Sequence, residues 1–156
     1  MKTNRIPQVL TVLLMTACMV VPLALTSCGN GGSSNEVGPA GSVTIKIDIT
    51  AAVEAKDATA VALAGQKGGN TYSYKVGIDE KDNVLTALQN SPSVVAIGSG
   101  GWGKYVDAID GLASGVVSDV AGWTFTINGE FAMVGPEEIP VKDGDVIVFT
   151  YVTSWE

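Results

Sequence analysis

Residues 122–131, GWTFTINGEF, constrain the fold of this chain more than any other stretch. The side chains of Trp123, Phe125 and Ile127 alternate with polar residues, which is the period-2 pattern of a strand with one buried face. Asn128-Gly129 follows, and this pair tolerates the positive φ angles of a type I′ turn. The sequence therefore predicts a tight β-hairpin with an aromatic inner face.

Residues 1–27 have the pattern of a bacterial lipoprotein signal peptide. Lys2 and Arg5 precede the apolar run 9–25, which closes on Leu-Thr-Ser before Cys28 and so resembles the segment before a lipid-modified cysteine. A transmembrane anchor is the alternative, but the run barely reaches the roughly 17–25 residues of a span and contains a proline. We expect cleavage before Cys28, acylation of that cysteine and attachment to a membrane through the lipid.

Residues 28–42 are rich in Gly and Ser and nearly devoid of large apolar side chains, so they predict a flexible tether. The residue after Cys28 is Gly29, where an Asp would favour retention at an inner membrane. We therefore expect an extracytoplasmic, membrane-anchored lipoprotein at the cell surface or outer membrane.

Composition excludes several classes of function. The chain has no histidine, and its two cysteines are Cys18, within the expected signal peptide, and Cys28. Imidazole or thiolate metal sites and Cys or Ser–His nucleophiles are therefore excluded within this chain. With 16 acidic against 9 basic residues and a net charge of −7, the surface repels nucleic acid, so no nucleic-acid partner is expected.

Residues 43–156 are predicted to form one α+β domain. Alternating apolar residues predict strands at 43–49 and 71–78, which we expect to pair as a hairpin. Segment 145–152 is apolar on both faces, which predicts a central strand. The Ala-rich segment 51–65 is compatible with either a short helix or an extended loop.

One main helix is predicted where Val84, Leu85 and Leu88 form a narrow apolar stripe. Asp79 or Asp82 would cap its N-terminus. The return strand of the late hairpin is expected at 130–134, and an irregular strand at 105–112 directs Ile109 and Leu112 inward.

Two motifs resemble catalytic or cofactor-binding sites, but neither has the neighbouring residues that such a site requires. Residues 98–103 fit the spacing GxGxxG, but the following segment has strand character, so a surface loop is predicted in place of a dinucleotide site. Turns favour Asp for hydrogen bonds to the local backbone, which accounts for Asp107, Asp110, Asp119, Asp143 and Asp145. We therefore expect no catalytic residue, no metal and no enzymatic activity.

Four segments come in the order typical of the DUF4430 domain, which is similar to the C-terminal β-grasp-like domain of transcobalamin and intrinsic factor. They are VLTALQ (84–89), GGWGKYVDAIDGL (100–112), GWTFTINGE (122–130) and VKDGDVIVFTYV (141–152). The resemblance implies a small β-grasp-like domain with a mixed sheet, one main helix and a late β-hairpin.

In those vitamin carriers the domain closes over cobalamin that is bound mainly to a helical barrel. The resemblance therefore implies ligand contacts from the loop and from the hairpin, at Gly101, Trp102, Gly103, Lys104, Tyr105, Trp123 and Phe125. A helical barrel would have to come from a partner in trans. Trp102 and Trp155 are the aromatics hardest to bury, so they are expected to contact a ligand or a protein partner.

The domain is therefore expected to have one of two functions. The first is that of a surface-anchored, non-enzymatic binding or protein-interaction module. The alternative is binding of cobalamin or a related corrinoid or tetrapyrrole, with this domain as the cap to a partner. No cofactor is expected beyond such a ligand.

Overall fold

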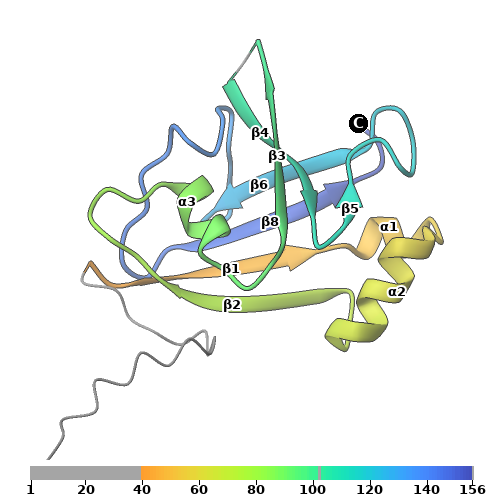
Figure 1. Ribbon diagram of the computed structural model, residues 1–156, viewed down its shortest axis with the longest axis horizontal. Coiled ribbons are helices and arrows are strands. Elements are labelled where there is room, and N and C mark those ends of the chain that lie inside the picture. The colour runs from red at the N-terminus through yellow and green to blue at the C-terminus, as the bar shows by residue number, and fades with distance from the viewer. Residues whose placement is uncertain (1–39, 102, 156) are drawn as a thin grey trace, which may run out of the picture. The chain divides into compact units, whose positions relative to one another are not determined.

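The computed structural model describes residues 40–101 and 103–155, and in this part the chain forms two β-sheets and three helices. The larger sheet has the strand order β2-β1-β8-β6-β7 and the smaller the order β3-β4-β5 (Figure 1). The larger sheet contains β1 (Ser42–Asp48), β2 (Thr71–Gly77), β6 (Gly122–Ile127), β7 (Glu130–Phe131) and β8 (Val146–Val152). The smaller sheet contains β3 (Val95–Gly100), β4 (Gly103–Ile109) and β5 (Leu112–Ala113).

The larger sheet is mixed. Strand β1 pairs antiparallel with β2 and parallel with β8, and β8 pairs antiparallel with β6. In Figure 1 the smaller sheet and α3 (Val84–Gln89) lie over one face of the larger sheet, and α1 (Thr50–Glu54) and α2 (Ala58–Lys67) follow the end of β1. The predicted α+β class, the β1–β2 hairpin and the central position of β8 are confirmed.

The Ala-rich segment 51–65 forms α1 and most of α2. Asp57 caps α2, since its Oδ1 accepts a hydrogen bond from the backbone N–H of Ala60 at 2.9 Å. The helix ends at Gly68, whose φ of 79° lies in the left-handed region. Its buried residues are only Ala60 and Leu63, so the segment lacks the strong apolar periodicity that identifies a helix. The described part thus contains three helices: the one that the sequence predicted, and two in the segment for which it allowed either a short helix or a loop.

The predicted helix at α3 is present, but its predicted cap is wrong. Asn83 caps it in a reciprocal arrangement: Asn83 Oδ1 accepts from the N–H of Thr86 at 2.9 Å, and Thr86 Oγ1 accepts from the N–H of Asn83 at 2.8 Å. Asp82 instead accepts from the N–H of Asp79 within the preceding turn. The predicted apolar stripe is buried, at Val84, Leu85 and Leu88.

The hairpin of 122–131 forms with the predicted two-residue turn. Asn128 and Gly129 have φ angles of 52° and 86°, and Ile127 pairs with Glu130 on either side of them. Asn128 also holds the turn against the neighbouring strand, because its Oδ1 accepts from the N–H of Val146 at 2.9 Å. The return strand stops at Phe131, so the prediction of a strand over 130–134 was too long.

The glycine-rich segment 98–103 was predicted as a loop, and most of it belongs to the β3–β4 hairpin. Gly98, Ser99 and Gly100 of β3 pair with Tyr105, Lys104 and Gly103 of β4. A strand follows these glycines, as predicted, where a dinucleotide-binding loop would need a helix. Ile109 and Leu112 point inward as predicted, and both are fully buried.

Aromatic side chains from β6 and β8 form the centre of the core. Trp123 meets Tyr151 edge-to-face with ring centroids 5.2 Å apart, and Phe125 meets Phe149 at 5.4 Å. The indole N–H of Trp123 donates to the carbonyl of Leu112 at 3.0 Å, which ties the larger sheet to β5. The aromatic face predicted for the hairpin packs on the core, with Phe125 buried and Trp123 partly buried. Among the helices of the described part, none is long and apolar enough to cross a membrane.

Two glycine substitutions test this backbone. Gly129→Ala should lower the free energy of unfolding by about 1–2 kcal/mol, because alanine is strained at a φ of 86°. Gly65→Ala, on the exposed side of α2, should raise it by about 0.5–1 kcal/mol, since an added β-carbon meets no described atom within 4 Å. Urea unfolding followed by circular dichroism measures both, and a Gly129→Ala variant as stable as the wild type would contradict the turn.

Candidate ligand-binding groove

A surface groove of about 650 Å³ lies between the β3–β4 hairpin and the segment 131–136. Its floor includes Phe125 and Phe149, which belong to the core. Its sides include Tyr105, Met133 and Trp155, whose side chains are 48%, 87% and 60% exposed. Apolar clefts of this size with aromatic walls are typical of sites for small, mostly apolar ligands.

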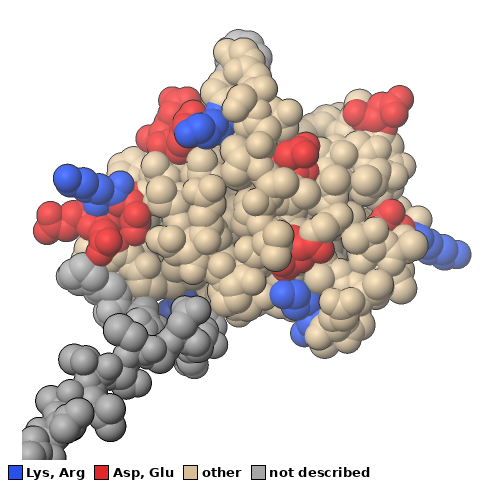
Figure 2. All heavy atoms as spheres, in the orientation of Figure 1, with Lys and Arg blue, Asp and Glu red and all other residues tan. Residues whose placement is uncertain are grey.

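An ion pair joins the two sides of the groove at its rim. Glu137 Oε1 accepts from the backbone N–H of Lys104 at 3.1 Å, and Glu137 Oε2 lies 3.1 Å from Lys104 Nζ. These hydrogen bonds hold the pKa of Glu137 below its usual value, and the bond from the backbone N–H of Lys104 has the largest effect. Figure 2 shows that the face of the molecule drawn there is largely uncharged, with most of its charged groups near the margin.

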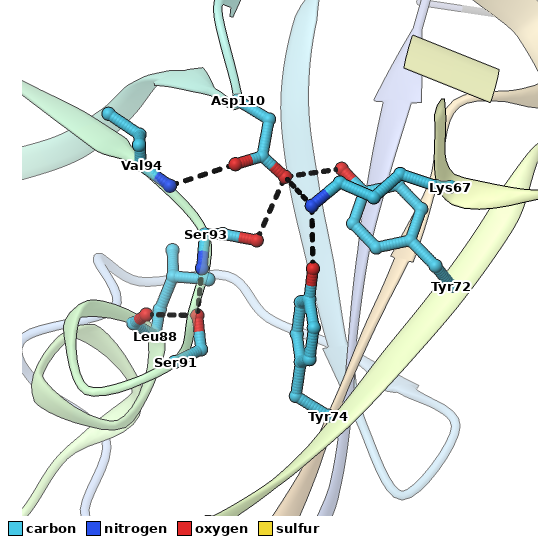
Figure 3. A network of polar contacts seen from close by, with 8 residues as sticks. All are labelled: Lys67, Tyr72, Tyr74, Leu88, Ser91, Ser93, Val94 and Asp110. Atoms are coloured by element: carbon cyan, nitrogen blue, oxygen red, sulfur yellow. Dashed lines mark hydrogen bonds and ion pairs between the residues drawn. The ribbon is translucent and has the colours of Figure 1, made fainter. Parts of the chain in front are cut away.

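A second cluster, the Asp110 network, joins α2, β2 and the turn after β4 (Figure 3). Asp110 Oδ2 accepts from the hydroxyls of Tyr72 at 2.9 Å and Ser93 at 3.0 Å, and Oδ1 accepts from the N–H of Val94 at 2.8 Å. Lys67 Nζ lies 3.2 Å from Asp110 Oδ2 and donates to the hydroxyl of Tyr74 at 2.7 Å. Four donors thus converge on one carboxylate.

These contacts fix the charge states in the network. Burial raises the pKa of Asp110, but its hydrogen bonds, led by the N–H of Val94, outweigh burial and bring the pKa below its usual value. Burial lowers the pKa of Lys67, but the bonds to Tyr74 and Asp110 raise it above its usual value. Burial, followed by the contact with Asp110, raises the pKa of Tyr72. A carboxylate held in this way stabilises the fold and is poorly placed to accept a proton.

Among residues 40–101 and 103–155, no group of three or more Asp, Glu, His or Cys side chains is close enough to hold a metal ion. The small pocket beside the network is lined by α2 and Asp110 and has a volume of about 380 Å³. The groove is therefore the larger of the two described hollows and the one with exposed aromatic walls.

Residues 81–153 match the family DUF4430, described as a domain of unknown function. The match covers slightly less than half of the chain. No curated protein matches the chain.

Two solved structures resemble this chain. A proposed metal-binding protein from Ruminococcus gnavus superposes with a TM-score of 0.54 at 17% identity, over 73% of this chain and 98% of that one. Haptocorrin in complex with Cbi superposes with a TM-score of 0.55 at 17% identity, over 84% of this chain and 28% of haptocorrin. At this identity the likeness shows a shared fold, and the chain spans less than a third of haptocorrin.

The groove brings together five of the seven residues that the resemblance implied as ligand contacts. These are Gly103, Lys104, Tyr105, Trp123 and Phe125. Gly101 is exposed at the hairpin tip and is not among the described residues that line the groove. Trp102 lies outside the described residues. The contacts of these residues with a ligand remain a prediction.

Sequence reasoning missed one side of the groove. Phe131, the last residue of β7, and Met133 and Val134, which follow it, line this side, whereas the sequence predicts a return strand over 130–134. Their signal in the sequence is a run of apolar residues just before Gly135-Pro136, which breaks the strand. Trp155, expected at a contact surface, does line the groove, and its indole N–H donates to the carbonyl of Val120 at 2.7 Å.

The Asp110 network predicts a pH-dependent stability. Asp110→Asn should lower the free energy of unfolding by about 1–2 kcal/mol near pH 7, since it weakens charge-assisted hydrogen bonds. Because the pKa of Asp110 is lowered in the fold, the wild-type advantage should be complete above the usual pKa of about 3.9 and should be lost as the pH falls through the lowered value.

The measurement for the Asp110 network is urea unfolding between pH 2 and 7, with Asp119→Asn as the control. Asp119 is exposed and lies outside the network, so its variant should match the wild type at every pH. A difference between wild type and Asp110→Asn that grows as the pH falls would contradict the assigned charge state.

Proposed function

We propose that this chain is a non-enzymatic binding module whose ligand occupies the groove between the β3–β4 hairpin and residues 131–136. The groove itself carries the proposal, because Tyr105, Phe131, Met133 and Trp155 leave large apolar surfaces exposed around one hollow. Exposed apolar side chains gathered in this way mark contact sites for ligands or partners. The Asp110 network, in contrast, is satisfied within the protein.

The ligand class best supported is a corrinoid or related tetrapyrrole. Five residues that the family resemblance implied as contacts line this groove, and haptocorrin in complex with Cbi shares the fold. Fold similarity transfers function only through the site, so the groove residues and not the fold support this assignment. The groove is open to solvent, which suits a domain that covers one side of a ligand while a partner in trans holds the other.

A protein segment is the second candidate occupant. Met133 is 87% exposed and Trp155 is 60% exposed, so the apolar surface continues past the floor of the groove to its outer edge. Met and Trp are enriched at the centres of protein interfaces. The module would then act in adhesion or partner recognition at the membrane to which its expected lipid attaches it.

Titration with a corrinoid tests the main proposal. The purified chain is mixed with dicyanocobinamide and the visible absorbance of the corrin is followed to about 1 mM, where binding is worth roughly 4 kcal/mol. Phe131→Ser should weaken binding by about tenfold or more, because it removes an aromatic wall that buries apolar ligand surface. Val94→Ser is the control, since Val94 is 75% exposed but is not among the residues that line the groove.

Three outcomes separate the candidates. A saturable signal that depends on Phe131 and not on Val94 supports the corrinoid assignment. The absence of any saturable signal for the wild type would remove it and leave the protein segment, which photo-crosslinking from position 133 in the native host would capture. Equal binding by Phe131→Ser and wild type would move the corrinoid site away from the groove.

Attachment through Cys28 has its own test. Cys28→Ser should abolish labelling by radioactive palmitate and release the chain from the membrane fraction, because this thiol is the proposed acceptor of the lipid. Cys18→Ser should label as the wild type does, since Cys18 would lie within the cleaved peptide. Labelling that survives Cys28→Ser would contradict Cys28 as the acceptor, and a wild type that stays in the membrane fraction without any labelling would argue for a transmembrane anchor.

A further inference from the structure

The ring of Tyr105 lies across the backbone of the neighbouring strand. Gly98 and Tyr105 are direct partners in the β3–β4 ladder, so their Cβ directions lie on the same side of the smaller sheet. A β-carbon added to Gly98 would overlap Cζ of Tyr105 and would come within 2.5 Å of its Cε2 and Oη atoms. A β-carbon on Gly100 would lie 3.7 Å from Cε1 of the same ring. The space that side chains of residues 98 and 100 would fill is thus occupied or bordered by the ring.

The same ring is also part of the groove. Tyr105 lines it, and its side chain is 48% exposed although part of it is covered by Gly98 and Gly100. One part of the ring is therefore supported by backbone, and the rest is open to a ligand. A flat aromatic surface that is rigidly supported from behind favours offset stacking with another flat, unsaturated group.

We propose that Gly98 is a positioning residue that holds Tyr105 as a stacking platform, so that the groove selects ligands with a flat, conjugated face over saturated ligands of similar size. This rests on the proposed function of the groove. Gly98 would act through Tyr105, because a larger residue at position 98 displaces the ring from the strand.

A purely structural role for the same pair has a different consequence. Aromatic residues opposite glycines stabilise β-ladders by covering the exposed backbone. In that case, replacing Gly98 would change stability and would affect flat and non-flat ligands alike. The selectivity between the two kinds of ligand therefore distinguishes a platform from a packing contact.

The experiment uses two neutral probes on the full chain. N-phenyl-1-naphthylamine presents a flat aromatic face and reports binding by fluorescence, and 1-adamantanol is a saturated cage that competes with it. Gly98→Ala should weaken the naphthylamine by roughly fivefold and change the adamantanol affinity by less than about twofold. Tyr105→Leu should do the same, and Tyr105→Phe, which keeps the ring, should retain the preference for the flat probe.

Gly65→Ala is the control, because Gly65 lies on the exposed side of α2, is not among the residues that line the groove, and an added β-carbon there meets no described atom within 4 Å. It should leave both affinities unchanged. The geometry has an independent readout in the nuclear magnetic resonance spectrum. The α-protons of Gly98 should be shifted upfield by the Tyr105 ring current in the wild type, and this shift should disappear in Tyr105→Leu.

The outcomes are distinct. Selective loss of the naphthylamine in Gly98→Ala and Tyr105→Leu supports the platform. Equal loss of both probes, unchanged binding in either variant, or a wild type that binds neither probe overturns it. A chain that binds the naphthylamine in this Gly98-dependent way but ignores dicyanocobinamide keeps the platform and removes the corrinoid proposal. A chain that binds dicyanocobinamide without dependence on Gly98 keeps the corrinoid proposal and removes the platform.

Discussion

The contact on which the groove depends is the one between the aromatic side chains of the larger sheet and the two-residue strand β5. Trp123 donates its indole N–H to the carbonyl of Leu112, and Tyr151 donates its hydroxyl to the carbonyl of Ala113 at 2.9 Å. Tyr151 is buried and Trp123 is partly buried against the core, and their bonds bring the polar ends of both aromatics to the two residues of β5. They fix the distance between the two sheets.

This fixed distance gives the β3–β4 hairpin a firm base. Ile109 and Leu112, at the end of β4 and the start of β5, are buried beneath it, while the hairpin tip projects beyond the core. The Asp110 network holds the same turn from the other side through α2 and β2. One side of the groove is therefore set by buried contacts at its base, and the Lys104–Glu137 pair joins it to the opposite side at the rim.

Strands and turns were predictable from the sequence because each has a local cause. Alternation in 43–49 and 71–78, and Asn128-Gly129 between two strands, specify structure within a few residues. The two helices in 50–67 were left open because small alanines bury little apolar surface and produce no clear stripe. The cap of α3 was misplaced because Asp79, Asp82 and Asn83 all suit the role, and the reciprocal bond with Thr86 is made only by Asn83.

The family resemblance implied five of the residues that line the groove, and the difficulty of burying Trp155 pointed to a sixth, but the other lining residues were not predicted. Tyr105 and Lys104 were implied by the motif of the β3–β4 segment. The opposite side was missed because Phe131 and Met133 are brought to the groove only by the fold. In the sequence, the short apolar run at the end of the hairpin has the pattern of a longer return strand. Which residues face each other across the groove is a tertiary property.

The parallel pairing of β1 with β8 has a consequence for the order in which the domain forms. The first and last strands of the described part are neighbours in the middle of the larger sheet, so the sheet cannot close until residues 146–152 are available. Contacts between such distant parts of a chain are made slowly, because the closure of a long loop comes before any stabilising contact. During synthesis β1 and β2 can pair early as a hairpin, but the aromatic core cannot form before Phe149 and Tyr151 have been synthesised. Folding is therefore completed from the C-terminal strand, and the groove exists only after the last strand has been inserted between β1 and β6.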